Sequence, residues 1–179
     1  MEDESQRLVK KAIKGNKSAF EKLVKQHYER IYRTAYLYVH NEEDALDVVQ
    51  EATFQAFRYI HSLKHPEYFM TWLTKIVIRC SADVLRRKSK VVPLSDEIIS
   101  NLPGMANSNF EDSMHLLNAI QQLKENYRTA IILFYYYDYS IKTISSVMEI
   151  PEGSVKTYLS RGKAELKKFY ENEEDKCHG

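Results

Sequence analysis

Apolar side chains recur every three or four positions through the first half of the chain, and this spacing predicts amphipathic helices. A short helix is expected over residues 1–15, followed by a long one that ends near His40. Ser18 and Glu21 have the spacing of a capping box, which predicts that the long helix begins there. Its apolar stripe predicts the side that it buries, namely Phe20, Val24, Tyr28, Ile31, Ala35 and Tyr38.

Two more helices are predicted before residue 90. Asn41 and the three acidic residues after it signal a helix start, because a capping side chain and first-turn carboxylates both complement the positive end of a helix. This helix is expected to run to about residue 60. After a loop, Pro66 fits the first turn of the next helix, whose predicted buried stripe is Phe69, Leu73, Ile76, Cys80 and Val84.

The helical pattern stops after Lys90 and resumes at Phe110. Residues 91–110 are rich in Pro, Gly, Asn and Ser and have no sustained period, which predicts a linker. Two helices are expected after it. The first should bury Met114, Leu117, Ile120 and Leu123, and the second Ala130, Leu133, Phe134 and Tyr137.

A helix-turn-helix is predicted between Ser140 and Lys168. Ser140 is a capping residue type ahead of a short apolar-periodic helix, and residues 149–153 interrupt the pattern. Pro151 suits the first turn of a second helix, and Gly153 tolerates whatever backbone angle the junction needs. The second helix has an inward seam of small and apolar residues: Val155, Leu159, Gly162, Leu166 and Phe169.

The predicted fold is therefore all-α, with two small helical domains joined by a flexible linker. The domains cover residues 1–90 and 111–172, and the second contains the helix-turn-helix. Residues 173–179 are expected to form an acidic, frayed tail. Nothing in the pattern indicates a strand or an internal repeat.

The second helix of the helix-turn-helix has a polar and basic outer face. In this motif the second helix enters the major groove of DNA, where Lys and Arg contact phosphates or guanine edges and Thr, Ser and Tyr bond phosphates or bases. An ordinary solvated helix face is the alternative. The candidate DNA-binding residues on this face are Lys156, Thr157, Tyr158, Ser160, Arg161 and Lys163.

Charge and cysteine content limit the classes of protein that the chain can belong to. Lys and Arg number 26 against 25 Asp and Glu, a formal net charge of +1, so nucleic-acid binding must come from local patches and be weak for the chain alone. Cys80 and Cys177 are far apart, which argues against a disulfide framework or a zinc site. The polar N-terminus and the lack of a membrane-length apolar run predict a soluble, cytoplasmic protein with no membrane insertion.

Three carboxylates lie three and four residues apart after Asn41, and like charges so placed destabilise an isolated helix by roughly a few tenths of a kcal/mol per pair. They are Asp44, Asp47 and Glu51, beside Gln50 and Phe54. A surface for a basic partner, an ordinary solvated face and a carboxylate metal site are the alternatives. No histidine stands at a spacing that completes a ligand set, so a metal site is disfavoured, and no cofactor or catalytic group is indicated.

The helix after Pro66 combines aromatic and basic side chains. Tyr68 and Trp72 are flat surfaces on which an unstacked base could lie, although packing in the core is the alternative for both. Positive charge on the same helix comes from Lys75, Arg79, Arg86 and Arg87.

Taken in order, these motifs resemble the extracytoplasmic-function class of bacterial RNA polymerase sigma factors. The resemblance covers nearly the whole chain and rests on three segments: DALDVVQEATF at 44–54, FMTWLTKIVIRCSADVLRR at 69–87, and EGSVKTYLSRGKAEL in the helix-turn-helix. It departs from the family pattern at Thr53, usually Phe; at Cys80, commonly Asn; and at Lys124, where a Leu-Pro pair often stands.

The resemblance implies a function for each segment. The first would bind the clamp helices of core RNA polymerase through Asp44, Asp47, Gln50, Glu51 and Phe54. The second would open and read the minus-ten promoter element through Tyr68, Trp72, Lys75, Arg79, Cys80, Asp83, Arg86 and Arg87. The helix-turn-helix would read the minus-thirty-five element, and residues 91–110 would be the connector through the polymerase.

The resemblance also bears on partners. Promoter DNA and bacterial core RNA polymerase are the expected partners, and an anti-sigma factor that covers the polymerase-binding surface is common in the resembled family. A free-standing helix-turn-helix regulator is the alternative, and it would bind DNA tightly without polymerase. An enzyme that uses the acidic helix as a metal site is a third hypothesis, which predicts stoichiometric metal uptake.

Overall fold

Helices make up the regular structure of residues 4–89 and 110–177, the part of the chain that this computed structural model describes. No strand occurs within those ranges, which confirms the predicted all-α class. The chain divides into two units, Met1–Val92 and Pro93–Gly179. The predicted linker lies outside the described residues, except that Phe110 is already the first residue of a helix.

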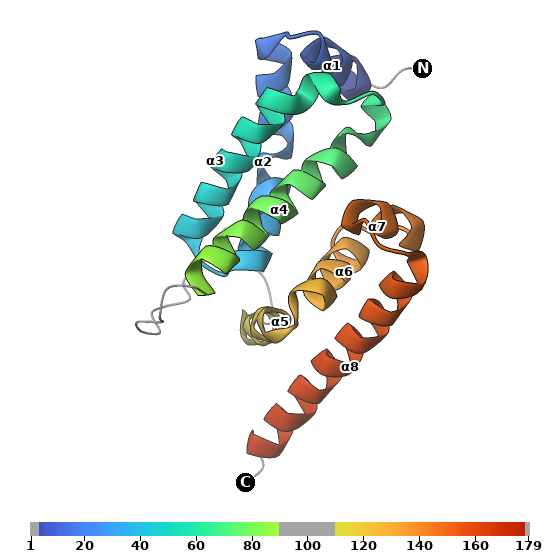
Figure 1. Cartoon of the computed structure of the whole chain (residues 1–179). Helices are drawn as coiled ribbons and strands as arrows, with labels where there is room; N and C mark the ends of the chain where they lie inside the picture. Colours follow the sequence, from blue (N-terminus) through green and yellow to red (C-terminus); the bar gives the residue numbers. More distant parts are fainter. Residues whose placement is uncertain (1–3, 90–109, 178–179) are drawn as a thin grey trace. The chain divides into compact units, whose positions relative to one another are not determined.

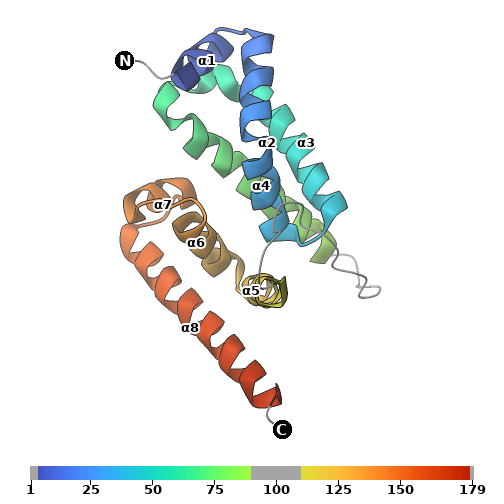
Figure 2. The same cartoon turned by 180° about the vertical axis from the view of Figure 1, so that it is seen from behind.

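The first unit is built on three helices that pack pairwise against one another, α2, α3 and α4 (Figures 1 and 2). The short helix α1 contacts α2 and two 3-10 turns, η1 and η2, that connect α3 to α4. The bounds are Glu4–Ile13 for α1, Lys17–Val39 for α2, Glu42–Tyr59 for α3, Ile60–Ser62 for η1, Pro66–Tyr68 for η2 and Phe69–Ser89 for α4.

Asparagine side chains begin the two helices α2 and α3. The Asn16 side chain accepts a hydrogen bond from the backbone N–H of Ala19 at 2.9 Å, so the capping box predicted at Ser18 is wrong and Ser18 lies inside the helix. Asn41 accepts from the N–H of Asp44 at 3.0 Å, as predicted. His40, with φ 52°, ends α2 in the left-handed conformation and makes the turn into Asn41 short.

The core of the first unit follows the predicted stripes with three exceptions. In α2 the buried residue is Leu23, and the predicted Val24 is only half-buried. Tyr28 is 44% exposed and stacks on Tyr32, so its predicted burial is wrong. In α4 the buried residue is Val77 and not Ile76, because positions three and four after Leu73 both satisfy helical spacing and the packing partner decides between them. Fully buried side chains include Leu23, Tyr38, Val48, Leu73 and Val77.

The described residues of the second unit, 110–177, form four helices, of which α6 packs along α8 and α7 lies at the N-terminal end of α8 (Figure 1). Their bounds are Phe110–Gln122 for α5, Glu125–Tyr135 for α6, Ile141–Met148 for α7 and Glu152–Cys177 for α8. Since α8 continues to Cys177, the frayed tail predicted from residue 173 is helical over most of its length. No helix in the described ranges is long and apolar enough to span a membrane.

A buried arginine joins α5 to α6. Arg128 in α6 is 8% exposed, and its guanidinium donates hydrogen bonds to the carbonyl oxygens of Ile120 at 3.2 Å and Leu123 at 3.1 Å, and to that of Gln121. These carbonyls lie at the C-terminal end of α5, where backbone oxygens lack intrahelical partners. Arg128 therefore fixes the start of α6 against the end of α5.

Candidate functional site

The acidic stripe predicted on α3 is divided in the structure. The Asp44 carboxylate accepts a hydrogen bond from Nζ of Lys88 near the end of α4, and the Asp44 side chain is only 14% exposed. Asp47 and Glu51 are exposed, and Glu51 accepts a hydrogen bond from the Gln55 amide at 2.7 Å. The carboxylates that this face presents to solvent are therefore those of Asp47 and Glu51.

Two exposed phenylalanines stand beside these carboxylates. Phe54 is 58% exposed and Phe57 is 46% exposed, and the Phe57 ring meets the edge of Phe20 at 5.2 Å between centroids. Sequence reasoning identified Phe54 and missed Phe57. The signal was available, because Phe57 lies three residues after Phe54 and outside the buried stripe that ends at Ala56.

An open groove of about 1130 Å³ lies along α3 and α4. It brings together side chains that the sequence assigned to two different partners. From α3 the lining includes Asp47, Gln50, Glu51 and Phe54, and from α4 it includes Cys80, Asp83, Arg86 and Arg87. Exposed aromatic rings among carboxylates suit a protein partner that offers apolar and basic groups.

The aromatic and basic residues of α4 share a face. They follow one another every three or four residues, and this spacing aligns side chains on one side of a helix. The residues are Trp72, Lys75, Arg79, Asp83 and Arg86. Tyr68 in η2 precedes them and is 58% exposed, whereas Trp72 is half-buried against Phe69 at 6.1 Å between ring centroids. The face therefore begins with one open ring and continues with positive charge.

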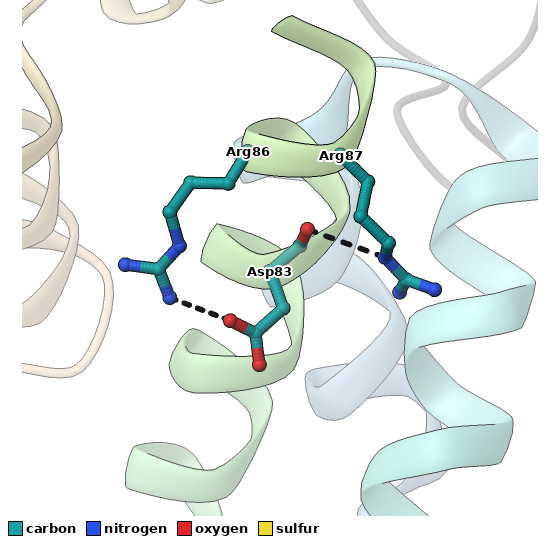
Figure 3. Close-up of polar contacts among 3 residues, drawn as sticks. All are labelled: Asp83, Arg86 and Arg87. Atoms are coloured by element: carbon teal, nitrogen blue, oxygen red, sulfur yellow. Dashed lines mark hydrogen bonds and ion pairs between the residues drawn. The ribbon is translucent and has the colours of Figure 1, made fainter. Parts of the chain in front are cut away.

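Asp83 orients two arginines near the end of α4, Arg86 on this face and Arg87 beside it (Figure 3). Its carboxylate accepts a hydrogen bond from Nη2 of Arg86 at 2.5 Å, and its backbone carbonyl accepts one from Nε of Arg87 at 3.3 Å. Figure 3 shows the two guanidinium groups on opposite sides of Asp83. Because the Arg86–Asp83 pair is solvent-exposed, it contributes little to stability and mainly fixes where the positive charge stands.

Cys80 is the predicted site residue that the structure removes furthest from solvent. Its side chain is 2% exposed, and burial, followed by the negative charges of Glu51 and Asp83, raises the pKa of the thiol to about 11. The thiol is therefore protonated at neutral pH. A side chain so covered has almost no surface with which to contact a base.

The helix-turn-helix forms where it was predicted, with a different junction. Ser140 caps α7 by accepting from the N–H of Thr143 at 3.1 Å. The left-handed residue of the turn is Glu149, with φ 56°, and not Gly153, which lies within α8. Pro151 directly precedes α8, and its carbonyl oxygen accepts a hydrogen bond from the N–H of Val155 at 3.2 Å, which is the first bond of the helix. Pro151 therefore starts α8 within one residue of the predicted position.

The outer face of α8 has an open centre and two supported edges. Lys156, Thr157 and Ser160 are exposed and lie opposite the buried Val155 and Leu159. The predicted residues at the edges contact α6. Tyr158, predicted to face outward, is half-buried against the Tyr127 ring; Arg161 donates to the Tyr127 hydroxyl; and the Lys163 ammonium lies over the Phe134 and Tyr135 rings.

The residues that the structure describes contain no group of three or more His, Cys, Asp and Glu side chains arranged to hold a metal ion.

Two family models match the chain. The Sigma-70 region 2 model matches residues 23–91, which contain α3 and α4, and the Sigma-70 region 4 model matches residues 113–166, which contain the helix-turn-helix. Together they account for more than half of the chain. Every residue of the three faces described above falls within these two stretches.

Named relatives and a solved structure agree with these matches. RNA polymerase sigma factor SigV of Bacillus subtilis (strain 168) is 33% identical over 138 residues, 77% of this chain and 82% of the relative. ECF RNA polymerase sigma factor SigW of the same organism is 31% identical over 174 residues, 89% of this chain and 93% of the relative.

The fold is similar to that of the sigma factor RpoE from Bartonella quintana, solved with the anti-sigma factor NepR. The TM-score is 0.72 at 18% identity, with 85% of this chain and 96% of that chain covered. With both family regions present in order and relatives aligned along most of their length, the chain belongs to the sigma-70 family, in its extracytoplasmic-function group, and is a sigma factor that directs promoter recognition and transcription initiation.

Proposed function

We propose that this sigma factor binds its partners through three faces. The α3 face binds core RNA polymerase, the α4 face binds the minus-ten element, and the outer face of α8 binds the minus-thirty-five element. One observation carries the assignment. All three exposed faces lie inside the stretches that match sigma-70 regions 2 and 4. Residues 1–90 and 111–172 then act as the two working domains.

The α3 face is assigned to core polymerase because of its chemistry. Asp47, Gln50 and Glu51 offer carboxylate and amide groups to basic and polar partners, and the exposed rings of Phe54 and Phe57 offer apolar area that a partner would bury. Asp44 contributes indirectly, because its bond to Lys88 ties the start of α3 to the end of α4.

The α4 face is assigned to the minus-ten element. Tyr68 provides an open ring for an unpaired base, with the half-buried Trp72 one turn further on. Lys75, Arg79, Arg86 and Arg87 provide charge for the phosphates of the opened strands, with Asp83 holding Arg86 in place. The surface can stabilise separated strands, which duplex opening requires.

The α8 face is assigned to duplex DNA. Thr157 and Ser160 stand at the open centre, where hydroxyl groups can bond base edges or phosphates, and Lys156 adds a positive charge near the N-terminal end of the helix. Tyr158, Arg161 and Lys163 form the edges, supported by α6.

In this proposal the chain binds promoter DNA tightly only when it is also bound to core polymerase. With a net charge of +1, the chain has no strong overall field for DNA. Binding two weak DNA-reading domains to one scaffold raises their combined affinity without new contacts. The chain itself supplies recognition and no catalytic group, and it acts where the polymerase is, in the cytoplasm.

An anti-sigma factor is a further proposed partner. The fold neighbour RpoE was solved with the anti-sigma factor NepR. In this chain the groove along α3 and α4 contains Asp47, Glu51 and Phe54, which are also proposed to bind polymerase. A protein bound there would compete directly with polymerase.

Co-elution with sigma-free core polymerase tests the α3 assignment. The Asp47→Arg, Glu51→Arg double variant should lose co-elution, because it reverses both exposed carboxylates of the face. The Glu21→Arg, Glu29→Arg variant makes the same charge change on α2, at side chains that are 64% and 74% exposed, and should keep co-elution. Equal behaviour of the two variants would contradict the assignment of α3.

A further inference from the structure

Tyr127 contacts two side chains of the proposed DNA-binding face, although it belongs to the preceding helix α6. Its ring lies 5.6 Å from the Tyr158 ring, between centroids, and its hydroxyl oxygen accepts a hydrogen bond from Nη1 of Arg161 at 3.4 Å. Tyr127 is itself only 8% exposed. It therefore has little surface for DNA and acts on the face only through its neighbours.

Side chains of α6 at and near Tyr127 pack closely against Gly162 of α8. A Cβ added to Gly162 would lie 3.0 Å from Cγ1 of Ile131 and 3.4 Å from Cβ of Tyr127, so the two helices approach as closely as a glycine allows. Arg128, the next residue, anchors the same turn of α6 to the end of α5. Tyr127 thus holds its contacts from a support that cannot easily shift.

The contact with Tyr127 limits the conformations that the Arg161 side chain can adopt. Arg161 is exposed on α8, and an arginine side chain in water samples many rotamers whose freedom is lost when it binds. The hydrogen bond that Arg161 donates to the Tyr127 hydroxyl restricts that freedom before DNA arrives. Restricting a side chain in its binding orientation raises affinity and sharpens geometry.

We propose that Tyr127 is a positioning residue for promoter recognition: its hydroxyl and ring hold Arg161 and Tyr158 in the orientation in which α8 meets the minus-thirty-five element. The inference rests on the proposed function of α8. It adds a specificity determinant on a helix that does not touch DNA.

The test uses reconstituted holoenzyme and a panel of promoters with single base changes in the minus-thirty-five element. Tyr127→Phe keeps the ring and removes the hydroxyl. It should weaken binding to the preferred promoter by roughly threefold to tenfold and reduce discrimination at the same base positions as Arg161→Ala. The double variant should bind no more weakly than Arg161→Ala alone, because the hydroxyl acts through that arginine.

Tyr135→Phe is the matched control, since it removes a hydroxyl from an exposed tyrosine of the same helix that lies beside Lys163 and not Arg161. It should bind every promoter as the unmodified protein does. Thermal unfolding of each variant separates positioning from folding, and Tyr127→Phe should unfold at the temperature of the unmodified chain.

Four results would overturn the inference. If Arg161→Ala impairs binding while Tyr127→Phe does not, or if the two losses add, Tyr127 has no positioning role and the assignment of α8 survives. If Tyr127→Phe weakens all promoters equally and lowers the unfolding temperature, its role is structural. If Arg161→Ala is itself without effect, both the inference and the assignment of Arg161 to DNA fail.

Discussion

His27 in α2 carries a nitrogen that the fold leaves unsatisfied. Its Nε2 is buried without a hydrogen-bond partner among the described residues, and its ring lies 5.9 Å from that of Phe69. Burial, followed by the positive charge of Arg30, lowers the pKa of His27. Protonation of the His27 imidazole is therefore less favourable in the folded chain than in the unfolded chain.

This difference predicts a loss of stability in mild acid. Below about pH 6.5 the unfolded state binds a proton at His27 that the folded state does not, so the free energy of unfolding falls until the pH reaches the lower folded-state pKa. Urea unfolding at pH 7.5 and pH 5.5 measures the fall, and His27→Phe should reduce it. His61→Phe, at an exposed histidine, is the control; an equal reduction in both variants would contradict the role of His27.

Residue identity alone fixed some of these environments and not others. Asn41 could be recognised as a helix cap because a cap depends on residues three positions away. The burial of Cys80 could also be predicted, because it belongs to the apolar stripe of its helix. Asp44 and Tyr158 could not be placed, because their burial depends on Lys88 and Tyr127, which are distant in sequence. Short-range sequence patterns predict local features such as helix caps, whereas tertiary contacts decide which polar side chains remain exposed to a partner.

At the scale of helices, the sequence predicted the existence of α2 to α8 better than their ends. Ser18 and Asn16 are both capping residue types ahead of the same stripe, and only the structure shows that Asn16 accepts the Ala19 N–H. The turn before α8 shows the same limit. Gly153 was the expected flexible point, yet Glu149 adopts the left-handed conformation and ends α7, with its N–H bonded to the carbonyl oxygen of Ser145.

The joint between α5 and α6 gave no sequence signal, because an arginine in an amphipathic pattern is ordinarily expected in water. Arg128→Ala should lower the free energy of unfolding by about 2–4 kcal/mol, since it leaves carbonyls at the end of α5 without their charged donor. Arg128→Lys keeps the charge without the planar donor array and should recover only part of the loss.

Hydrogen exchange in the full chain tests where this loss arises. Amides of α6 should exchange faster in Arg128→Ala, because the joint opens before the first unit does. The exposed Arg79→Ala variant serves as the arginine control and should leave unfolding within roughly 0.5 kcal/mol of the unmodified chain. Unchanged unfolding in Arg128→Ala would show that water replaces the guanidinium at no cost.

At the scale of the whole molecule, positive and negative side chains lie on different faces although the net charge is close to zero. The net charge of +1 includes exposed carboxylates on α3 and basic groups on α4 and α8. If two of these faces read DNA and one binds polymerase, as proposed, the arrangement is an advantage, because a large uniform positive charge would bind DNA without selection. Near-neutrality therefore favours promoter binding that depends on polymerase.

This organisation predicts how promoter affinity responds to salt. Lys156→Ala should lower the slope of log affinity against log salt by about 1 for holoenzyme and weaken all promoter sequences alike, if Lys156 contacts a phosphate. Lys167→Ala removes the same charge from α8 at a lysine that is 78% exposed and pairs with Glu171, so it should leave the slope unchanged. If both variants lower the slope equally, the DNA responds to the charge of α8 as a whole, and the assignment of a defined face loses its basis. A lower slope in Lys156→Ala alone would place the duplex at the N-terminal part of the helix. Thr157 and Ser160 are exposed there and could then contact base edges.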